Sequence, residues 1–196
     1  MDINILLFDD FETLDVFGPV EVFGSVGKSY SLRYISSEGG LIRSRHGFLV
    51  HTSPLEEFME GGVLFLPGGY GVRPLVNEES YLDMVRELAY RSNYCMTVCT
   101  GSALLAKTGL LKGKKATSNK IAFDWVKSLD PEVLWLPRAR WSVDGKYWTS
   151  SGVSAGIDMA LSFVERFNGR DKALDVARFI EYIWNENMEE DPFSAI

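Results

Sequence analysis

Short apolar runs alternate along the chain with segments whose apolar residues recur every three or four positions. Short runs of this kind are typical of buried strands, and the wider spacing is typical of amphipathic helices. In the first half of the chain we predict strands at residues 3–8, 30–36, 62–66 and 94–98. Helices are predicted after three of these strands, at residues 14–26, 78–92 and 100–108. Strands that alternate with helices predict an α/β fold with a mostly parallel sheet covered on both faces.

The second half of the chain continues this alternation with shorter elements. We predict a short strand at 116–118, a helix at 119–128 and strands at 133–136, 139–143 and 146–149. Asp144-Gly145 separates the last two strands, and this dipeptide is a common hairpin turn. We predict a β excursion at 41–51 and closing helices at 153–167 and 170–184. Because no repeat, low-complexity tract or linker-like stretch interrupts the pattern, residues 1–196 are predicted to form a single domain.

The charge balance argues against nucleic acid as a partner. The chain has 27 acidic and 20 basic residues, which give a net charge of −7, and it carries no basic stripe. No run approaches the roughly 20 apolar residues that cross a bilayer, so we expect no membrane partner. The first predicted strand begins at residue 3, so we expect no signal peptide. Two cysteines in a chain of this size favour a reducing compartment, and we expect a cytoplasmic protein.

Cys99 lies where the strand at 94–98 ends and a helical pattern begins. This arrangement predicts a sharp strand-to-helix turn, the geometry of a nucleophile elbow. The free N–H groups of a helix N-terminus stabilise an anion, so we expect the thiol pKa to lie below its ordinary value of about 8.5. Cys95 lies among apolar neighbours and is predicted to be a buried, unreactive thiol. Four extended residues span about 13 Å, so we expect no disulfide between the two cysteines.

Chemically versatile residues follow three different predicted strands. Asp15 comes after the first strand, Gly68 and Gly69 come after the strand at 62–66, and Cys99 ends the next one. In parallel α/β sheets, ligands bind beyond the carboxyl ends of the strands. We therefore expect these residues to converge in one crevice. Apolar neighbours such as Phe17 are expected to raise the pKa of a carboxyl group there.

Five fragments in this order identify a family likeness. They are Thr-Leu-Asp-Val-Phe-Gly-Pro at 13–19, Leu-Pro-Gly-Gly at 66–69, Val-Cys-Thr-Gly at 98–101, Ala-Thr-Ser at 116–118 and Ser-Ala-Gly-Ile-Asp at 154–158. Together they resemble the ThiJ/PfpI family, which shares its fold with class I glutamine amidotransferase domains. The resemblance extends over nearly the whole chain. It implies a flavodoxin-like three-layer sandwich with a mostly parallel central sheet and a cysteine nucleophile elbow.

Within that family the chain is most similar to the isonitrile hydratases, which add water to an isonitrile to give an N-substituted formamide. This resemblance implies that Cys99 is the nucleophile, Asp15 the neighbouring acid/base and Thr100 a second catalytic polar group. Peptide N–H groups near Gly68, Gly69 and Thr100 are implied to bind substrate or a developing anion. The resemblance also implies a small-molecule substrate and a homodimer. We expect neither a cofactor nor a metal.

One position departs from the pattern of many relatives. Those with hydrolase or amidotransferase-like activity place a histidine near the strand at 116–118, where this chain has Asn119. Its two histidines, His46 and His51, lie in the β excursion, where no partner at ligand spacing suggests a metal. The departure weakens a Cys-His hydrolase and a glyoxalase interpretation. The hydratase interpretation is unaffected, because its acid/base role needs only the carboxyl.

Two other functions stay open. The first is a non-enzymatic redox or ligand sensor that uses Cys99; related domains form the ligand-binding halves of AraC-like regulators, although we expect no helix-turn-helix segment after this domain. The second is a glyoxalase or deglycase activity on methylglyoxal. Two further acids are left outside the site: Glu12 is expected to be solvated, and Asp158 is expected to cap or pair locally.

Overall fold

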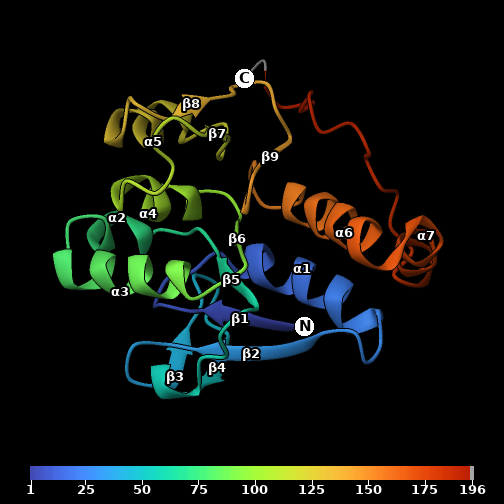
Figure 1. Cartoon of the computed structure of the whole chain (residues 1–196), viewed down its shortest axis with the longest axis horizontal. Helices are drawn as coiled ribbons and strands as arrows, with labels where there is room; N and C mark the ends of the chain where they lie inside the picture. Colours follow the sequence, from blue (N-terminus) through green and yellow to red (C-terminus); the bar gives the residue numbers. More distant parts are fainter. Residues whose placement is uncertain (195–196) are drawn as a thin grey trace.

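The computed structural model, which describes residues 1–194, is built around a six-stranded sheet with the strand order β2-β1-β5-β6-β10-β9 (Figure 1). Its strands are β1 (Asp2–Leu6), β2 (Ser31–Ile35), β5 (Val63–Leu66), β6 (Tyr94–Thr97), β9 (Trp141–Asp144) and β10 (Tyr147–Ser150). All neighbours pair in parallel except β9 and β10, which are antiparallel. The predicted α/β class with a mostly parallel sheet is confirmed.

Helices cover both faces of this sheet and complete a three-layer sandwich (Figure 1). One face carries α1 (Thr13–Ser25), α6 (Ala155–Asn168) and α7 (Arg170–Phe179), which pack against one another. The other carries α3 (Glu79–Tyr90) and α4 (Gly101–Lys107), and α4 also packs against α2 (Val72–Leu75) and α5 (Phe123–Leu129). The flavodoxin-like arrangement expected from the sequence is therefore present.

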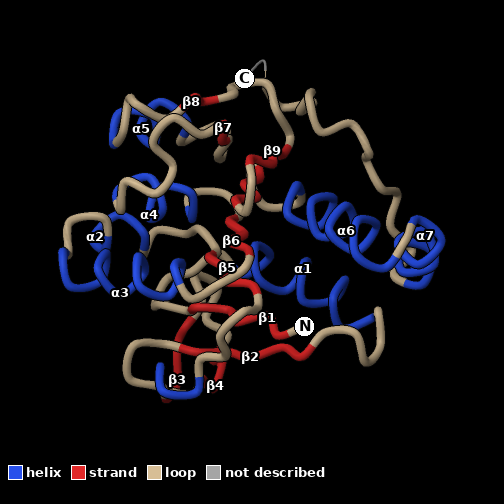
Figure 2. The backbone as a smooth tube through the Cα atoms, in the orientation of Figure 1, coloured by secondary structure: helices blue, strands red, loops and turns tan. Residues whose placement is uncertain are grey.

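Two small sheets and a short 3-10 helix lie outside the main sheet (Figure 2). The predicted β excursion is an antiparallel hairpin of β3 (Gly40–Arg43) and β4 (Leu49–Thr52), followed by the 3-10 helix η1 (Leu55–Glu57). The second small sheet pairs β7 (Lys115–Ala116) with β8 (Leu134–Trp135) in parallel. The hairpin is close to the start of α1, because Thr13 Oγ1 lies 3.1 Å from Ser44 Oγ.

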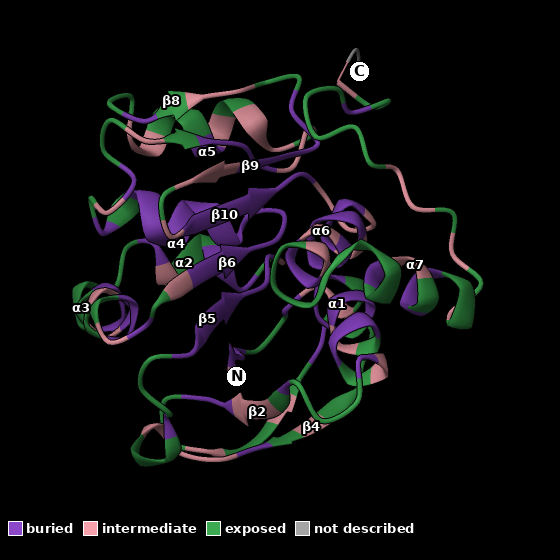
Figure 3. Cartoon of the chain, turned by 45° about the vertical axis from the view of Figure 1, so that its right-hand side comes forward, coloured by how far each residue is buried: buried purple, intermediate pink, exposed green. Residues whose placement is uncertain are grey.

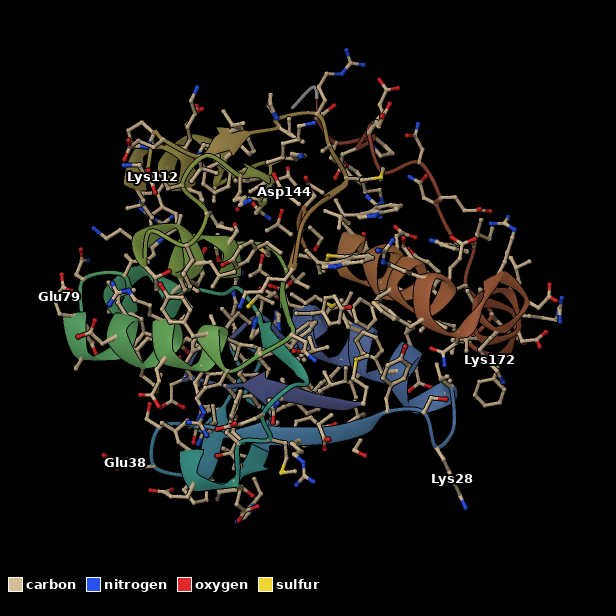
Figure 4. All side chains as sticks on the ribbon, in the orientation of Figure 1. Lys28, Glu38, Glu79, Lys112, Asp144 and Lys172 are labelled. Atoms are coloured by element: carbon tan, nitrogen blue, oxygen red, sulfur yellow. The ribbon has the colours of Figure 1, made fainter. Side chains whose placement is uncertain are left out.

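The centre of the main sheet is buried on both faces, as the apolar runs predict, while the edge strands β2 and β9 are partly exposed. Every residue of β5 and β10 is buried, and only Tyr94 of β6 is partly exposed (Figure 3). Full burial of a Val, Leu or Phe side chain contributes about 1.5–3 kcal/mol, so these strands form the stable base on which the site is built. Charged side chains gather at the outer surface, among them the labelled Lys28, Glu38, Glu79, Lys112 and Lys172 (Figure 4).

Two helix boundaries lie four or five residues from the predicted ones, and one helix was not predicted. Helix α5 begins at Phe123 and not at residue 119, because Asn119 Oδ1 accepts the Ala122 N–H and holds a turn before the helix. Helix α7 ends at Phe179 and not at residue 184, and Glu181 has a positive φ of 52° that no helix continues. The four-residue helix α2 was not predicted. Among the described helices, none is both long and apolar enough to cross a membrane.

The segment after α7 is tied back to the body by a buried ion pair. Asp158 on α6 pairs with Arg140 at 2.5 Å between Oδ2 and Nη2, and both side chains are almost fully buried. Asp158 Oδ1 also accepts the N–H of Asn185 at 2.9 Å, and Arg140 donates its own N–H to the carbonyl of Met188. The expectation that Asp158 caps or pairs locally is wrong, because its partners Arg140 and Asn185 are 18 and 27 residues away in the chain. Asp158 instead anchors the returning chain.

Candidate active site

The predicted site residues meet at the carboxyl end of the central strands. From β1 the chain passes to β2 on one side of the sheet and later to β5 on the other, so β1 and β5 flank the topological switch point. Asp15 follows β1, Gly68 follows β5, and Cys99 follows β6, which is the next strand along. Ligands of open α/β sheets bind at such a point. The expected crevice is present.

Cys99 occupies a strained turn between β6 and α4. Its φ is +58°, a left-handed conformation that few residues other than glycine adopt. Its N–H donates to the Ser151 carbonyl at 3.1 Å, and its carbonyl accepts the hydroxyl hydrogen bonds of Ser102 at 3.2 Å and Ser118 at 2.9 Å. Gly101 permits the turn, because a Cβ there would lie 2.3 Å from the Leu66 carbonyl oxygen. The elbow is thus held by hydrogen bonds and by close backbone packing.

Asp15 is a fully buried acid in the first turn of α1. Its Oδ2 accepts the N–H of Gly68 at 2.8 Å. Its Oδ1 is buried and has no hydrogen-bond partner among residues 1–194. A Cβ on Gly68 would lie 2.9 Å from Asp15 Oδ2 and 2.6 Å from the Thr100 nitrogen, so only glycine leaves room for this arrangement. One carboxyl oxygen of Asp15 is therefore held by the loop after β5, and the other is available to accept or donate a proton.

Thr100 links the elbow to the loop after β5. Its Oγ1 accepts the N–H of Gly69 at 3.1 Å, while its own backbone N–H is directed to the sulfur of Cys99. The N–H groups of Gly68 and Gly69 thus already have acceptors within the protein. At these two atoms the structure shows positioning of Asp15 and Thr100, so binding of a substrate or anion there stays a prediction.

Burial raises the pKa of Asp15 from 3.8 to about 7. The largest cause is the loss of water around the carboxylate, and the negative charge of Glu12 adds to it. The hydrogen bond from the Gly68 N–H, together with the polar hydrogens of the neighbouring Cys99 side chain and Val153 N–H, opposes this rise without cancelling it. A carboxyl group with this pKa exchanges protons readily near neutral pH.

The expected lowering of the Cys99 pKa is wrong. Burial and the neighbouring Asp15 raise the pKa of this thiol well above its ordinary value. The N–H groups of Thr100 and Val153 stabilise the thiolate, but they are outweighed. The helix-dipole argument missed a buried acid beside the sulfur. Because the two groups disfavour each other's ionisation, they titrate as a pair that retains a proton at neutral pH.

A cleft of about 290 Å³ opens onto Cys99, with Asp15 buried behind it. Its walls come from the loops that follow β1, β5, β6, β7 and β10 and from the β3–β4 hairpin. The lining residues are Glu12, Arg45, Gly69, Tyr70, Arg73, Cys99, Thr100, Asn119, Ile121, Ala122 and Val153. Cys99 is 7% exposed, which is enough to bring its sulfur to the cleft floor. Cys95 is fully buried.

Several cleft residues escaped the sequence argument. Glu12 is not solvated as expected: its side chain is 13% exposed and pairs with Arg45 at 3.2 Å. Val153 has a φ of +45°, a rare conformation for a β-branched residue, and it directs its N–H to the Asp15–Cys99 pair. Phe17, expected beside the site, packs against Phe48 on the surface with 5.7 Å between ring centroids. The positive φ of Val153 could not be predicted from the sequence, because a valine is not typical of that backbone conformation.

Asn119 and the histidines do not form a proton relay at the sulfur. The Oδ1 of Asn119 is used by the Ala122 N–H at 3.0 Å, so this amide caps the turn before α5. His46 Nδ1 lies 2.9 Å from Thr13 Oγ1 and 3.6 Å from Glu12 Oε1, behind the cleft-lining acid. Within residues 1–194, no group of three or more histidine, cysteine or acidic side chains is arranged to hold a metal ion.

Comparison with known proteins gives one consistent result. Residues 1–166 match the DJ-1/PfpI family. An isonitrile hydratase from Pseudomonas putida is 34% identical over 184 residues, which cover 93% of this chain and 78% of that enzyme. A deglycase from Thermococcus kodakarensis is 29% identical over 154 residues, covering 77% of this chain and 89% of that protein. The crystal structure of a THiJ/PfpI family protein from Pseudomonas syringae has a TM-score of 0.81 at 27% identity, covering 98% of this chain and 77% of that one.

Proposed function

We propose that this chain, which belongs to the DJ-1/PfpI family, is a cysteine-dependent enzyme that hydrates isonitriles to N-substituted formamides. In this proposal Cys99 is the nucleophile, Asp15 transfers protons, and Thr100 supports the sulfur through its backbone N–H. The similarity to an isonitrile hydratase over 93% of the chain favours this reaction over the others known in the family.

One observation carries the proposal: the buried carboxyl group of Asp15, which has a pKa of about 7, lies beside a cysteine at the floor of a cleft. Isonitrile hydration needs a soft nucleophile for the terminal carbon and a group that both takes and returns protons. The Cys99 thiol and the unpartnered Oδ1 of Asp15 meet these two needs. No histidine takes part in this scheme.

The first step adds the S–H group across the isonitrile carbon. The Cys99 sulfur forms a bond to that carbon as Asp15 accepts the thiol proton, and Asp15 then delivers the proton to the same carbon. The product is a thioimidate, R–N=CH–S, on Cys99. The raised thiol pKa suits this coupled transfer, because a buried free thiolate beside an ionised Asp15 is disfavoured.

The second half of the reaction consumes one water. Its oxygen adds to the thioimidate carbon and the nitrogen gains a proton, with Asp15 passing the proton from oxygen to nitrogen. The C–S bond then breaks, the hydroxyl proton leaves as the C=O bond forms, and Cys99 regains its proton. The sum is one isonitrile plus one water to one formamide, with no oxidant or cofactor.

The proposal is tested by turnover of an isonitrile panel beside methylglyoxal, with formamide measured by NMR. Wild-type protein and Cys95→Ala should form formamide, and Cys99→Ala should not. Turnover of methylglyoxal alone would replace the hydratase by a glyoxalase or deglycase. Turnover of neither substrate, together with oxidation of Cys99 by mild peroxide, would replace it by a sensor.

We also propose a homodimeric assembly and a cytoplasmic location. Large apolar side chains are exposed beside one another on α1 and the β3–β4 hairpin, including Phe17 at 36% and Phe48 at 56% exposure. A patch of this kind is typical of a protein interface. The two free cysteines fit a reducing compartment. Light scattering of the purified protein at micromolar concentration tests the dimer, which a monomeric mass would exclude.

A further inference from the structure

The mouth of the cleft carries two arginines, although the whole chain has a net charge of −7. Arg45 comes from the loop that follows β3, and Arg73 comes from α2, after β5. Positive side chains are therefore gathered at the entrance to an otherwise acidic protein's cleft. The two arginines differ in whether their charge is already neutralised.

Arg45 is neutralised within the protein. Its guanidinium Nη1 pairs with Glu12 Oε2 at 3.2 Å, and the group stacks over the ring of Tyr70 at 4.3 Å from the centroid. Glu12 is mostly buried by these contacts. The pair of Arg45 and Glu12 thus adds little net charge to the cleft.

Arg73 carries a charge that nothing in the cleft offsets. Among residues 1–194 no acidic side chain lies within ion-pair distance of its guanidinium, which stacks over the ring of Trp125 at 4.3 Å from the centroid. Stacking on an aromatic face fixes the plane of the guanidinium and leaves its edge donors free. Those donors match the two oxygens of a carboxylate.

We infer that the cleft selects small substrates that carry a carboxylate, and that Arg73 is the residue that recognises it. This inference rests on the proposed function: the substrate class is an isocyano carboxylate, whose isonitrile carbon reaches Cys99 while its carboxylate binds Arg73. The volume of about 290 Å³ lies at the low end of small-molecule pockets and suits a molecule of amino-acid size. The exposed side chain of Ile121 adds an apolar surface to the same cleft.

The charge preference can be measured without any turnover. Iodoacetate and iodoacetamide have nearly the same size and both alkylate a thiol, but only iodoacetate is anionic. For Cys99, the ratio of the iodoacetate rate to the iodoacetamide rate should fall about three- to tenfold in Arg73→Gln. Arg73→Lys keeps the positive charge but lacks the planar guanidinium, so its rate ratio should lie between those of wild type and Arg73→Gln.

Arg166→Gln is the matched control. Arg166 is exposed on α6 and stacks over Phe167 at 5.9 Å from the centroid, so the control removes the same charge and the same kind of stacking away from the cleft. Its rate ratio should stay within about twofold of wild type. An unchanged ratio in Arg73→Gln, or an equal fall in Arg166→Gln, would overturn the inference.

A second measurement separates this inference from the proposed reaction. The ratio of kcat/KM for isocyanoacetate to that for its methyl ester should be lower in Arg73→Gln than in wild type. If neither isonitrile is consumed but the alkylation ratio falls as expected, the hydratase proposal fails and the anion selectivity stands. If both are consumed and neither ratio responds to Arg73→Gln, the hydratase proposal stands and the role of Arg73 is excluded.

Discussion

Cys95 and Cys99 lie four residues apart, at the middle and at the end of the same strand-and-turn unit, yet their surroundings differ completely. Cys95 is fully buried in β6, where its sulfur lies 3.9 Å from the carbonyl oxygen of Ala89, and burial raises its pKa to about 12. Cys99 sits on the strained turn, faces the cleft and has Asp15 beside it.

The difference between the two cysteines is not one of thiol acidity. Burial raises the pKa of both, so neither thiol is poised as a free thiolate. What Cys99 has and Cys95 lacks is a path to a ligand and a carboxyl group that can take its proton. In the proposed mechanism, turnover therefore depends on the pair of Cys99 and Asp15 and not on the dipole of α4 alone.

Replacing each cysteine in turn should give the largest difference in activity between the two positions. Cys99→Ala should lower kcat/KM for isonitrile hydration by at least about 10⁴-fold, because the covalent route is lost. Cys95→Ala removes one buried sulfur from β6 and should stay within about threefold of wild type, with a modest loss of stability. Steady-state kinetics on both folded variants measures the contrast, and equal losses would refute the division between the two sites.

Asp15→Asn tests whether Asp15 acts by transferring protons, because asparagine has nearly the same size as aspartate but no acidic group. The amide cannot accept and return a proton, so we expect kcat/KM to fall about 10³-fold. Cys99 should still react with iodoacetamide in this variant, because access to the sulfur is preserved. Alkylation followed by peptide mapping is the control for folding of the site. Near-wild-type turnover by Asp15→Asn would remove Asp15 from the mechanism.

The same substitution should stabilise the protein at neutral and higher pH. The pKa of Asp15 is raised by folding from 3.8 to about 7, so wild type loses stability as the pH rises through that interval. Asp15→Asn avoids this loss, so its advantage should grow from nearly none at pH 4 to at most about 4 kcal/mol at pH 8. Denaturant unfolding at both pH values measures this advantage, and Asp171→Asn, at an exposed position of α7, is the control. An advantage independent of pH would contradict burial of an ionisable group.

Gly68→Ala should show how closely the activity of Cys99 depends on the position of Asp15, because the added methyl group displaces Asp15 slightly. The added Cβ would lie 2.6 Å from the Thr100 nitrogen and 2.9 Å from Asp15 Oδ2, so both must shift. A displacement of this size is expected to lower kcat/KM about 10²-fold. Gly24→Ala is the matched control on α1, where the nearest atom lies 3.9 Å from the new Cβ. Full activity in Gly68→Ala would mean that this loop does not position the acid.

Much of this arrangement could be predicted from local sequence patterns, and part of it could not. Apolar runs identified the central strands, and the three loop motifs identified Asp15, Gly68 and Cys99 as neighbours, because strand ends in a parallel sheet meet on one edge. The thiol pKa depends on a buried acid brought in from α1, which the helix pattern around Cys99 does not contain. The ion pair of Glu12 with Arg45 likewise joins segments far apart in the chain.

The covalent thioimidate on Cys99 is the most direct test of the account. Wild-type protein is mixed with an aliphatic isonitrile and quenched within milliseconds with borohydride, which reduces the C=N bond and stabilises the adduct. Both cysteines lie between Arg91 and Lys107, so the tryptic peptide must be fragmented to assign the site. We predict an added mass equal to the isonitrile plus two hydrogens on Cys99, present in Cys95→Ala and absent in Cys99→Ala. Formamide production without such an adduct, or with the adduct on Cys95, would contradict the account.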